Sequence, residues 1–376
     1  MIYLVLLFFS YFLRRVLVII IDELFNLNTS LIFSFFMCLG QICGGSLIYW
    51  YQKKFLNKKK KRSNSRHTTL YELIETEREM TIPDSKRKMI LLIFFASFFD
   101  LEEFLILYVF LPKIQILSKT TTLRLSCIMT ITSSFTCKYI LRFKISKHQI
   151  FSLIIMGILS LVIIILEINF RSTYFSEVDL EAYLLVFCHF IFLSFTDVIE
   201  KYLADYDFVN PFQILMLEGT FSLIWSLFFS ISRNPLEEVT TIYKKESKSN
   251  FFLLLGLFII YAVLSAFINI YKILCNVLYS PMTKSLASYF LISPFIIYHY
   301  AVGNDFLING ESDLFYFLIS LFFSVIINFF GLIYNEFFII QCCGLSNETY
   351  EGISTRAKIM ELESIIFKRD DDNDDL

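Results

Sequence analysis

Ten apolar runs, each long enough to cross a lipid bilayer, constrain this chain more than any other feature. About twenty residues of helix span the hydrocarbon core, and a spanning backbone must satisfy its own hydrogen bonds, which favours helices. The runs, numbered one to ten in chain order, lie at residues 2–21, 30–51, 89–110, 120–141, 149–168, 181–202, 211–231, 251–272, 280–301 and 313–341. The sequence therefore predicts an all-α membrane protein with ten transmembrane helices embedded in a lipid bilayer.

The composition and the motifs exclude several classes of protein. With 56% hydrophobic residues and a mean hydropathy of +0.63, the chain is no ordinary soluble domain. A formal net charge of −2 gives no basis for a nucleic-acid partner. The four histidines are scattered, and the sequence has no phosphate-binding glycine loop, Ser/His/Asp arrangement or metal-ligand spacing of cysteines. We therefore expect no enzymatic activity, no cofactor, no metal and no ATP-driven pumping.

The distribution of lysine and arginine predicts the orientation of the spans. The loop 53–88 opens with the densest basic run, residues 53–66, and the turn 142–148 is also basic. Ten spans place both on one side, which the positive-inside rule makes cytosolic together with both termini. The loop 232–250 disagrees, because it carries three lysines on the opposite side. Asn28 opens an Asn-Thr-Ser sequon on that outer side and is a candidate glycosylation site.

Three spans carry stripes of polar residues at helical spacing, so that each stripe occupies one helix face. The stripes are Thr122, Ser126, Thr130, Ser133 and Cys137 in the fourth span, Tyr261, Ser265, Asn269, Lys272 and Asn276 in the eighth, and Ser320, Ser324, Asn328, Gly331 and Asn335 in the tenth. Small hydroxylated residues favour helix packing, which is our interpretation of the fourth stripe. The Tyr, Asn and Lys side chains of the stripe in the eighth span favour the wall of a polar cavity. The stripe in the tenth span fits helix packing and a cavity wall equally well.

Carboxylates within the spans need partners, because a charged group near the membrane centre costs roughly 2.5–3.5 kcal/mol. Asp100 and Glu103 share one face of the third span, where Arg124, Lys272 or Lys284 could neutralise them. An internal salt-bridge network and a role toward substrate or protons are equally compatible with this pattern.

Two further carboxylates receive different interpretations. Glu218 lies in the middle of the seventh span with no cation within a turn of it, and we expect it to serve function rather than folding. Glu200 closes the sixth span beside Lys201, and we expect this pair to anchor the helix at the cytosolic interface.

The start of the ninth span combines features that favour an anion. Pro281 suits the first turn of a helix, the free amides of that turn attract negative charge, and Lys284 adds a cation. We expect Lys272 or Lys284 to meet an anionic solute. The alternative is that both lysines snorkel to the cytosolic interface.

Residues 111–168 present several features in a fixed order. A short connection leads to Leu123-Arg124, a hydroxyl-rich span, the basic turn 142–148, His148-Gln149 and a span that contains Gly157. In this order and spacing the region resembles the end of the first repeat in the drug/metabolite transporter superfamily, in its nucleotide-sugar-transporter-like (EamA-type) branch. The Gly-Ala-Leu-Asn-Lys motif of the GDP-mannose class is absent at the start of the ninth span, although Lys284 stands nearby.

The resemblance implies two inverted five-helix repeats, which agrees with the similar spacing of spans one to five and six to ten. The repeats would be residues 1–172, with the cytoplasmic loop 53–88, and residues 173–345, followed by a cytoplasmic tail at 346–376 with an acidic end. The function implied is secondary transport of a small polar or anionic solute, such as a nucleotide sugar or related metabolite, by alternating access. An endomembrane (Golgi, ER or endosome) is then expected rather than the plasma membrane, and a homodimer is compatible with the sequence.

The candidate substrate-binding residues combine this implication with the polar positions inside the spans. They are Glu103, Thr130, Glu218, Tyr261, Asn269, Lys272, Asn276 and Lys284. The alternative function is a multispan protein that transports nothing, such as a lipid-modifying enzyme or a membrane scaffold. An enzyme of that kind would gather titratable residues near one interface, whereas these carboxylates lie near mid-span, which favours transport.

Overall fold

A computed structural model gives the fold. It describes residues 2–25, 31–62, 84–104, 127–171, 177–232, 248–285 and 313–340, with a few isolated positions outside these ranges. Its long helices are α1 (Ile2–Phe25), α2 (Leu31–Arg62), α4 (Asp84–Phe104), α7 (Cys127–Ile140), α8 (Lys147–Arg171), α9 (Glu177–Asp205), α10 (Pro211–Ser232), α12 (Lys248–Leu278) and α14 (Asp313–Tyr334). Within the described ranges the secondary structure is helical and contains no strand.

Seven of these helices are long and apolar enough to cross a membrane, as expected of a multi-pass membrane protein. They are α1, α2, α8, α9, α10, α12 and α14. The expected third span corresponds to α4, whose ends carry several charges, and the fourth to α7, of which 14 residues are described. Of the expected ninth span, residues 281–285 are helical and most of the remainder lies outside the described residues. The count of ten spans and the inverted repeat therefore stay predictions.

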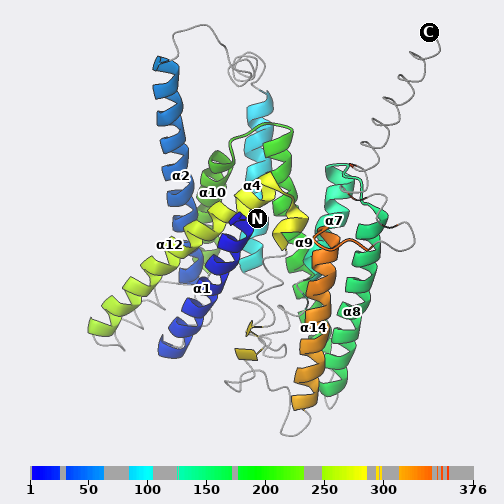
Figure 1. The fold of residues 1–376 in the computed structure, drawn as a ribbon. Helices are drawn as coiled ribbons and strands as arrows, with labels where there is room; N and C mark the ends of the chain where they lie inside the picture. The colour runs from blue at the N-terminus through cyan, green and yellow to red at the C-terminus, as the bar shows by residue number, and fades with distance from the viewer. Residues whose placement is uncertain are drawn as a thin grey trace, which may run out of the picture.

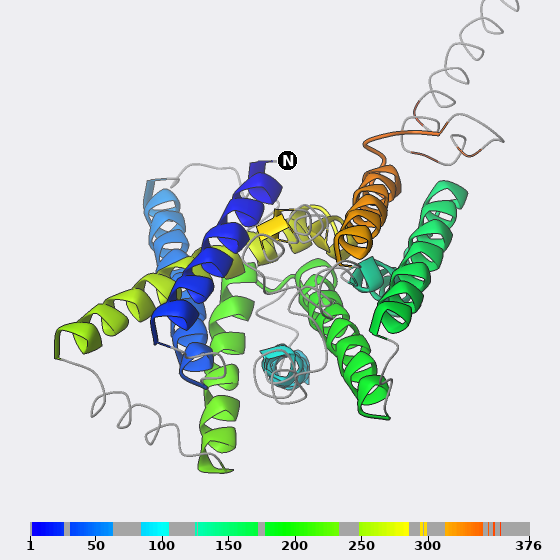
Figure 2. The same ribbon diagram turned by 90° about the horizontal axis from the view of Figure 1, so that it is seen from below.

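The helices form two groups with α4 between them (Figures 1 and 2). In the first group α12 packs against α1, α2 and α10, and α2 also packs against α10. In the second group α7 packs against α8 and α9, and α14 packs against α8. Helix α4 contacts α10 on one side and α9 on the other, and the C-terminal part of α12 reaches across to α9. The two groups therefore meet along α4, α9 and α12.

The outer helices run in both directions along the molecule. In the view of Figure 1, α2 and α14 both run upward, whereas α1 runs downward from the N-terminus. The C-terminal ends of α2 and α14 therefore point the same way. Of the expected loop 53–88, residues 53–62 continue α2 as helix and residues 84–88 begin α4. The side that faces the cytosol stays a prediction.

A defined cap begins α10 directly after α9. Phe208 has a positive φ of 50°, which turns the chain, and the Asn210 side chain accepts a hydrogen bond from the Phe212 amide at 2.9 Å. Pro211 occupies the first helical position, where its missing N–H is no loss. This short connection leads the chain from α9 on one side of α4 to α10 on the other side.

Glycines allow α2 to approach two helices closely. A Cβ atom at Gly40 would overlap the backbone carbonyl oxygen of Ala262 on α12. On the α10 side, a Cβ atom at Gly219 would lie 3.1 Å from the Cβ atom of Gln41 on α2. Small residues permit this backbone approach, from which dispersion contacts between membrane helices are gained. The position of α2 therefore depends on these glycines.

We expect Gly40→Ala to lower the thermal unfolding midpoint of the detergent-solubilised protein, because the added methyl group overlaps α12. Overpacking of this kind typically costs about 1–3 kcal/mol. Gly256→Ala on α12 is the matched control, since a Cβ atom there meets nothing within 4 Å. It should leave the midpoint unchanged or raise it, because alanine favours helix. Equal effects of the two substitutions would contradict the close approach of α2 to α12.

Candidate functional site

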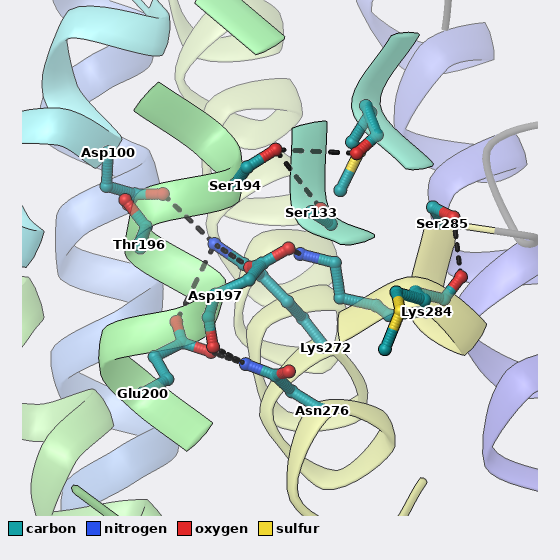
Figure 3. Close-up of polar contacts among 12 residues, drawn as sticks. Asp100, Ser133, Ser194, Thr196, Asp197, Glu200, Lys272, Asn276, Lys284 and Ser285 are labelled. Carbon is teal, nitrogen blue, oxygen red and sulfur yellow. Dashed lines mark hydrogen bonds and ion pairs between the residues drawn. The ribbon is translucent and has the colours of Figure 1, made fainter. Parts of the chain in front are cut away.

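A buried lysine lies at the junction of the two helix groups, surrounded by three carboxylates (Figure 3). The Lys272 ammonium on α12 donates to Asp100 Oδ1 on α4 at 3.1 Å. It also lies 3.9 Å from Asp197 Oδ1 and 3.8 Å from Glu200 Oε1, both on α9. Asp197 and Glu200 are three residues apart, so they share one face of their helix. One ammonium therefore joins α4, α9 and α12.

A second lysine extends this network toward the start of the ninth span. The Lys284 ammonium forms an ion pair with Asp197 Oδ2. The Asn276 side-chain amide donates to Glu200 Oε2 at 2.8 Å and to the Asp197 carbonyl oxygen at 2.7 Å. We define the charge network as Asp100, Asp197, Glu200, Lys272, Asn276 and Lys284.

The local structure explains the position of Lys284. As the sequence predicts, Pro281 starts a helical turn. The Ser280 hydroxyl caps this turn by accepting a hydrogen bond from the Thr283 amide at 3.0 Å. The neighbouring residue, Ser285, shares a 2.5 Å hydrogen bond with Thr130 on α7. These contacts hold the turn between α7 and α9, so that Lys284 faces Asp197.

The charge network is almost completely removed from solvent. Asp197 is fully buried, Glu200 and Lys284 are 2% exposed, and Lys272 and Asp100 are 5% and 6% exposed. Burying a charge without a partner is strongly unfavourable, so mutual pairing is the condition for keeping these groups ionised. Both lysines therefore lie inside the protein, and the alternative that they snorkel to the interface is wrong.

Glu218 is a separate buried carboxylate on α10. It is fully buried, and Gln41 on α2 donates its side-chain amide to Glu218 Oε2 at 3.3 Å. Glu218 Oε1 and Gln41 Oε1 are buried with no hydrogen-bond partner among the described residues. No ammonium or guanidinium of the described residues lies within 4.0 Å of this carboxylate.

Hydroxyl groups of α7 make hydrogen bonds to neighbouring helices. Of the predicted stripe, Ser133 bonds to Ser194 on α9 at 3.1 Å, and Thr130 bonds to Ser285. Two hydroxyls beside the stripe do the same, because Thr132 bonds to Ser194 at 2.5 Å and Ser134 bonds to Tyr334 on α14 at 2.8 Å. The contacts of Ser133 and Thr130 agree with the interpretation of this stripe as packing, while Thr122 and Ser126 lie outside the described residues.

The structure brings some of the sequence-predicted site residues together and separates others. Lys272, Asn276 and Lys284 belong to the charge network, and Thr130 adjoins it through Ser285. Asn269 is buried one turn before Lys272, and its amide nitrogen has no hydrogen bond in the described structure. Tyr261 instead packs edge-on against Phe33 in an aromatic cluster. The side chain of Glu103, and Asn28, lie outside the described residues.

The expectation that Glu200 and Lys201 anchor α9 at the membrane interface is wrong. Glu200 belongs to the charge network, and Lys201 is 6% exposed and donates to the Val277 carbonyl oxygen at 2.6 Å. Sequence reasoning also missed Asp197, the carboxylate that contacts both lysines. The available signal was the spacing of Asp197 and Glu200 inside an otherwise apolar span. Gln41, an amide inside the second span, was a similar signal.

The Lys272 ammonium occupies the centre of the carboxylate cluster. Among the described residues, no group of three or more His, Cys, Asp or Glu side chains is arranged to hold a metal ion. The arrangement can hold an anion through a lysine, or a proton on a carboxylate.

Neither a protein-family model nor a curated protein matches this chain.

We expect Lys272→Met to destabilise the protein strongly, because three buried carboxylates would then face one another without the central ammonium. Removing one partner of a buried ion pair typically costs about 3–5 kcal/mol. Thermal unfolding in detergent is the measurement, and Lys53→Met on the exposed surface of α2 is the matched control. If both variants unfolded at the wild-type temperature, the network would not hold the two helix groups together.

Proposed function

We propose that this chain is a secondary transporter that moves a small polar or anionic solute by alternating access. The observation that carries the proposal is the charge network, which is buried where the two helix groups meet in a chain with seven apolar helices of spanning length. Ionisable groups inside a membrane protein are costly and commonly mark the path of a substrate or an ion. The resemblance to drug/metabolite transporters supports the same function.

Lys284 is the best candidate for the group that receives an anion. Lys272 is surrounded by three carboxylates, whereas the only carboxylate within ion-pair distance of Lys284 among the described residues is Asp197. An anion could replace Asp197 at the Lys284 ammonium and accept charge-assisted hydrogen bonds. The hydroxyls of Ser285 and Thr130 lie on the adjoining turn and on α7, where they could donate to the same solute.

The ion pairs of Asp197 could also control access to the site. Asp197 lies near Lys272 as well as Lys284, and Lys272 joins α9 of the second helix group to α12 of the first. An anion that displaces Asp197 from Lys284 frees this carboxylate to move relative to Lys272, which would change how firmly the two groups are held together. This gives binding and helix movement a common cause, as alternating access requires.

The alternative is a membrane scaffold or a lipid-modifying enzyme, in which the charge network would serve folding. In a scaffold, replacing Lys284 would change stability and no transport would be found. The two functions are therefore separated by measuring transport and stability on the same variants.

We expect Lys284→Gln to weaken anion transport in proteoliposomes. The loss of a charge-assisted hydrogen bond costs about 1.5–3 kcal/mol, which corresponds to a roughly tenfold or larger increase in the half-saturating concentration. Uptake and exchange of inorganic phosphate, succinate and nucleotide sugars would be measured, with Lys53→Gln as the matched control. Anion transport through this site would be contradicted if the wild-type protein transported none of these anions. It would also be contradicted if Lys284→Gln left the half-saturating concentration unchanged.

A further inference from the structure

Among the described residues, the buried ionisable groups at the junction of the helix groups include more acids than bases. Four carboxylates, those of Asp100, Asp197, Glu200 and Glu218, are 0–6% exposed, whereas the charge network supplies two ammonium groups, Lys272 and Lys284. Lys201 is paired with Asp205 outside this set. If all six groups were ionised, the cluster would carry a formal charge of −2. Such a charge away from water is strongly unfavourable, so at least one carboxylate needs a proton or a cation.

Glu218 is the carboxylate whose surroundings favour the binding of such a proton or cation. On α2, Gln41 hydrogen-bonds to it and the buried thiol of Cys38 interacts with it electrostatically, and neither carries a positive charge. The charged groups that act on it from the other helices are Asp100 of α4, Asp197 and Glu200 of α9, and Lys272 of α12. Three of these four groups are acidic. Its ionised form is therefore surrounded mainly by like charge and makes no ion pair with the described part of the chain.

The unpartnered atoms around Glu218 favour a proton over a metal cation. Glu218 Oε1 and Gln41 Oε1 are both acceptors, both buried, and both without a hydrogen bond among the described residues. A proton would make one Glu218 oxygen a donor, and the Gln41 oxygen is the kind of acceptor that such a donor needs. Hard cations are usually held by about six oxygen ligands, many more than these two.

We propose that Glu218 is a proton-binding site whose occupancy controls anion binding at the charge network, which makes the proposed transporter a proton–anion symporter. The inference rests on the proposed function. A proton from water binds a Glu218 oxygen, removes one negative charge from the cluster, and is released to water on the other side. Since protonation reduces the repulsion of an incoming anion, each ligand raises the affinity for the other by the same factor.

The first test needs no solute and measures the thermal unfolding midpoint of the detergent-solubilised protein between about pH 5 and pH 8. In this range an unfolded chain has an ionised glutamate, while the folded protein keeps the proton on Glu218. The folded state then binds more protons, so its stability falls as the pH rises. Glu218→Gln should flatten this decline, because glutamine resembles the protonated carboxyl group and has no proton to lose.

The matched control is Glu336→Gln, the same change beyond the end of α14 and outside the charge network. It should keep the wild-type dependence on pH. Identical pH profiles for wild type and Glu218→Gln would overturn the proton site.

The second test uses proteoliposomes and the phosphate, succinate and nucleotide-sugar panel. An inward proton gradient should drive accumulation of the transported anion in wild type and in Glu336→Gln. Glu218→Gln should lose this accumulation but keep exchange of internal for external anion, since exchange needs no net proton movement. Two results would overturn the inference. One is accumulation of the anion driven by a sodium gradient at constant pH, and the other is accumulation driven by a proton gradient in Glu218→Gln. Absence of all transport by wild type would refute the proposed function, and the unfolding comparison would still decide whether Glu218 holds a proton.

Discussion

The ion pairs of Lys272 are the interaction on which the rest of the structure depends. A lysine and three carboxylates are each costly to remove from water, and their mutual attraction offsets this cost only when they are close together. Their side chains come from α4, α9 and α12, so this condition fixes three helices relative to one another. The same helices lie where the two groups meet. The electrostatic requirement therefore also determines how the halves of the described molecule join.

Close helix packing determines which polar groups meet outside this centre. Gly219 follows Glu218 on α10, and its missing side chain lets α2 approach so that Gln41 lies beside the carboxylate. On the neighbouring part of α2, Gly40 permits contact with α12. A larger residue at either glycine would separate the helices and move Gln41. The unusual surroundings of Glu218 therefore result from backbone packing as much as from charge.

Local patterns in the sequence predicted the helices and part of the site. Apolar length predicted the seven helices that can span a membrane, and Pro281 predicted the start of the turn that carries Lys284. Helical spacing placed Lys272 and Asn276 on one face. The partners of these groups depend on tertiary packing, which no local pattern contains. Glu200 shows this most clearly, because its place near the end of a span suggested the interface although α12 covers it.

The excess of acid over base connects the two proposed roles of this region. An anion must approach through the field of four carboxylates, and two ammonium groups cannot neutralise all of them. Removing Asp197 from Lys284 to admit the anion would leave one more carboxylate without its partner. A proton bound at Glu218 relieves part of this repulsion without occupying either lysine. The anion site would therefore be electrostatically accessible in the protonated state and blocked in the ionised state, which couples the two ligands through charge alone.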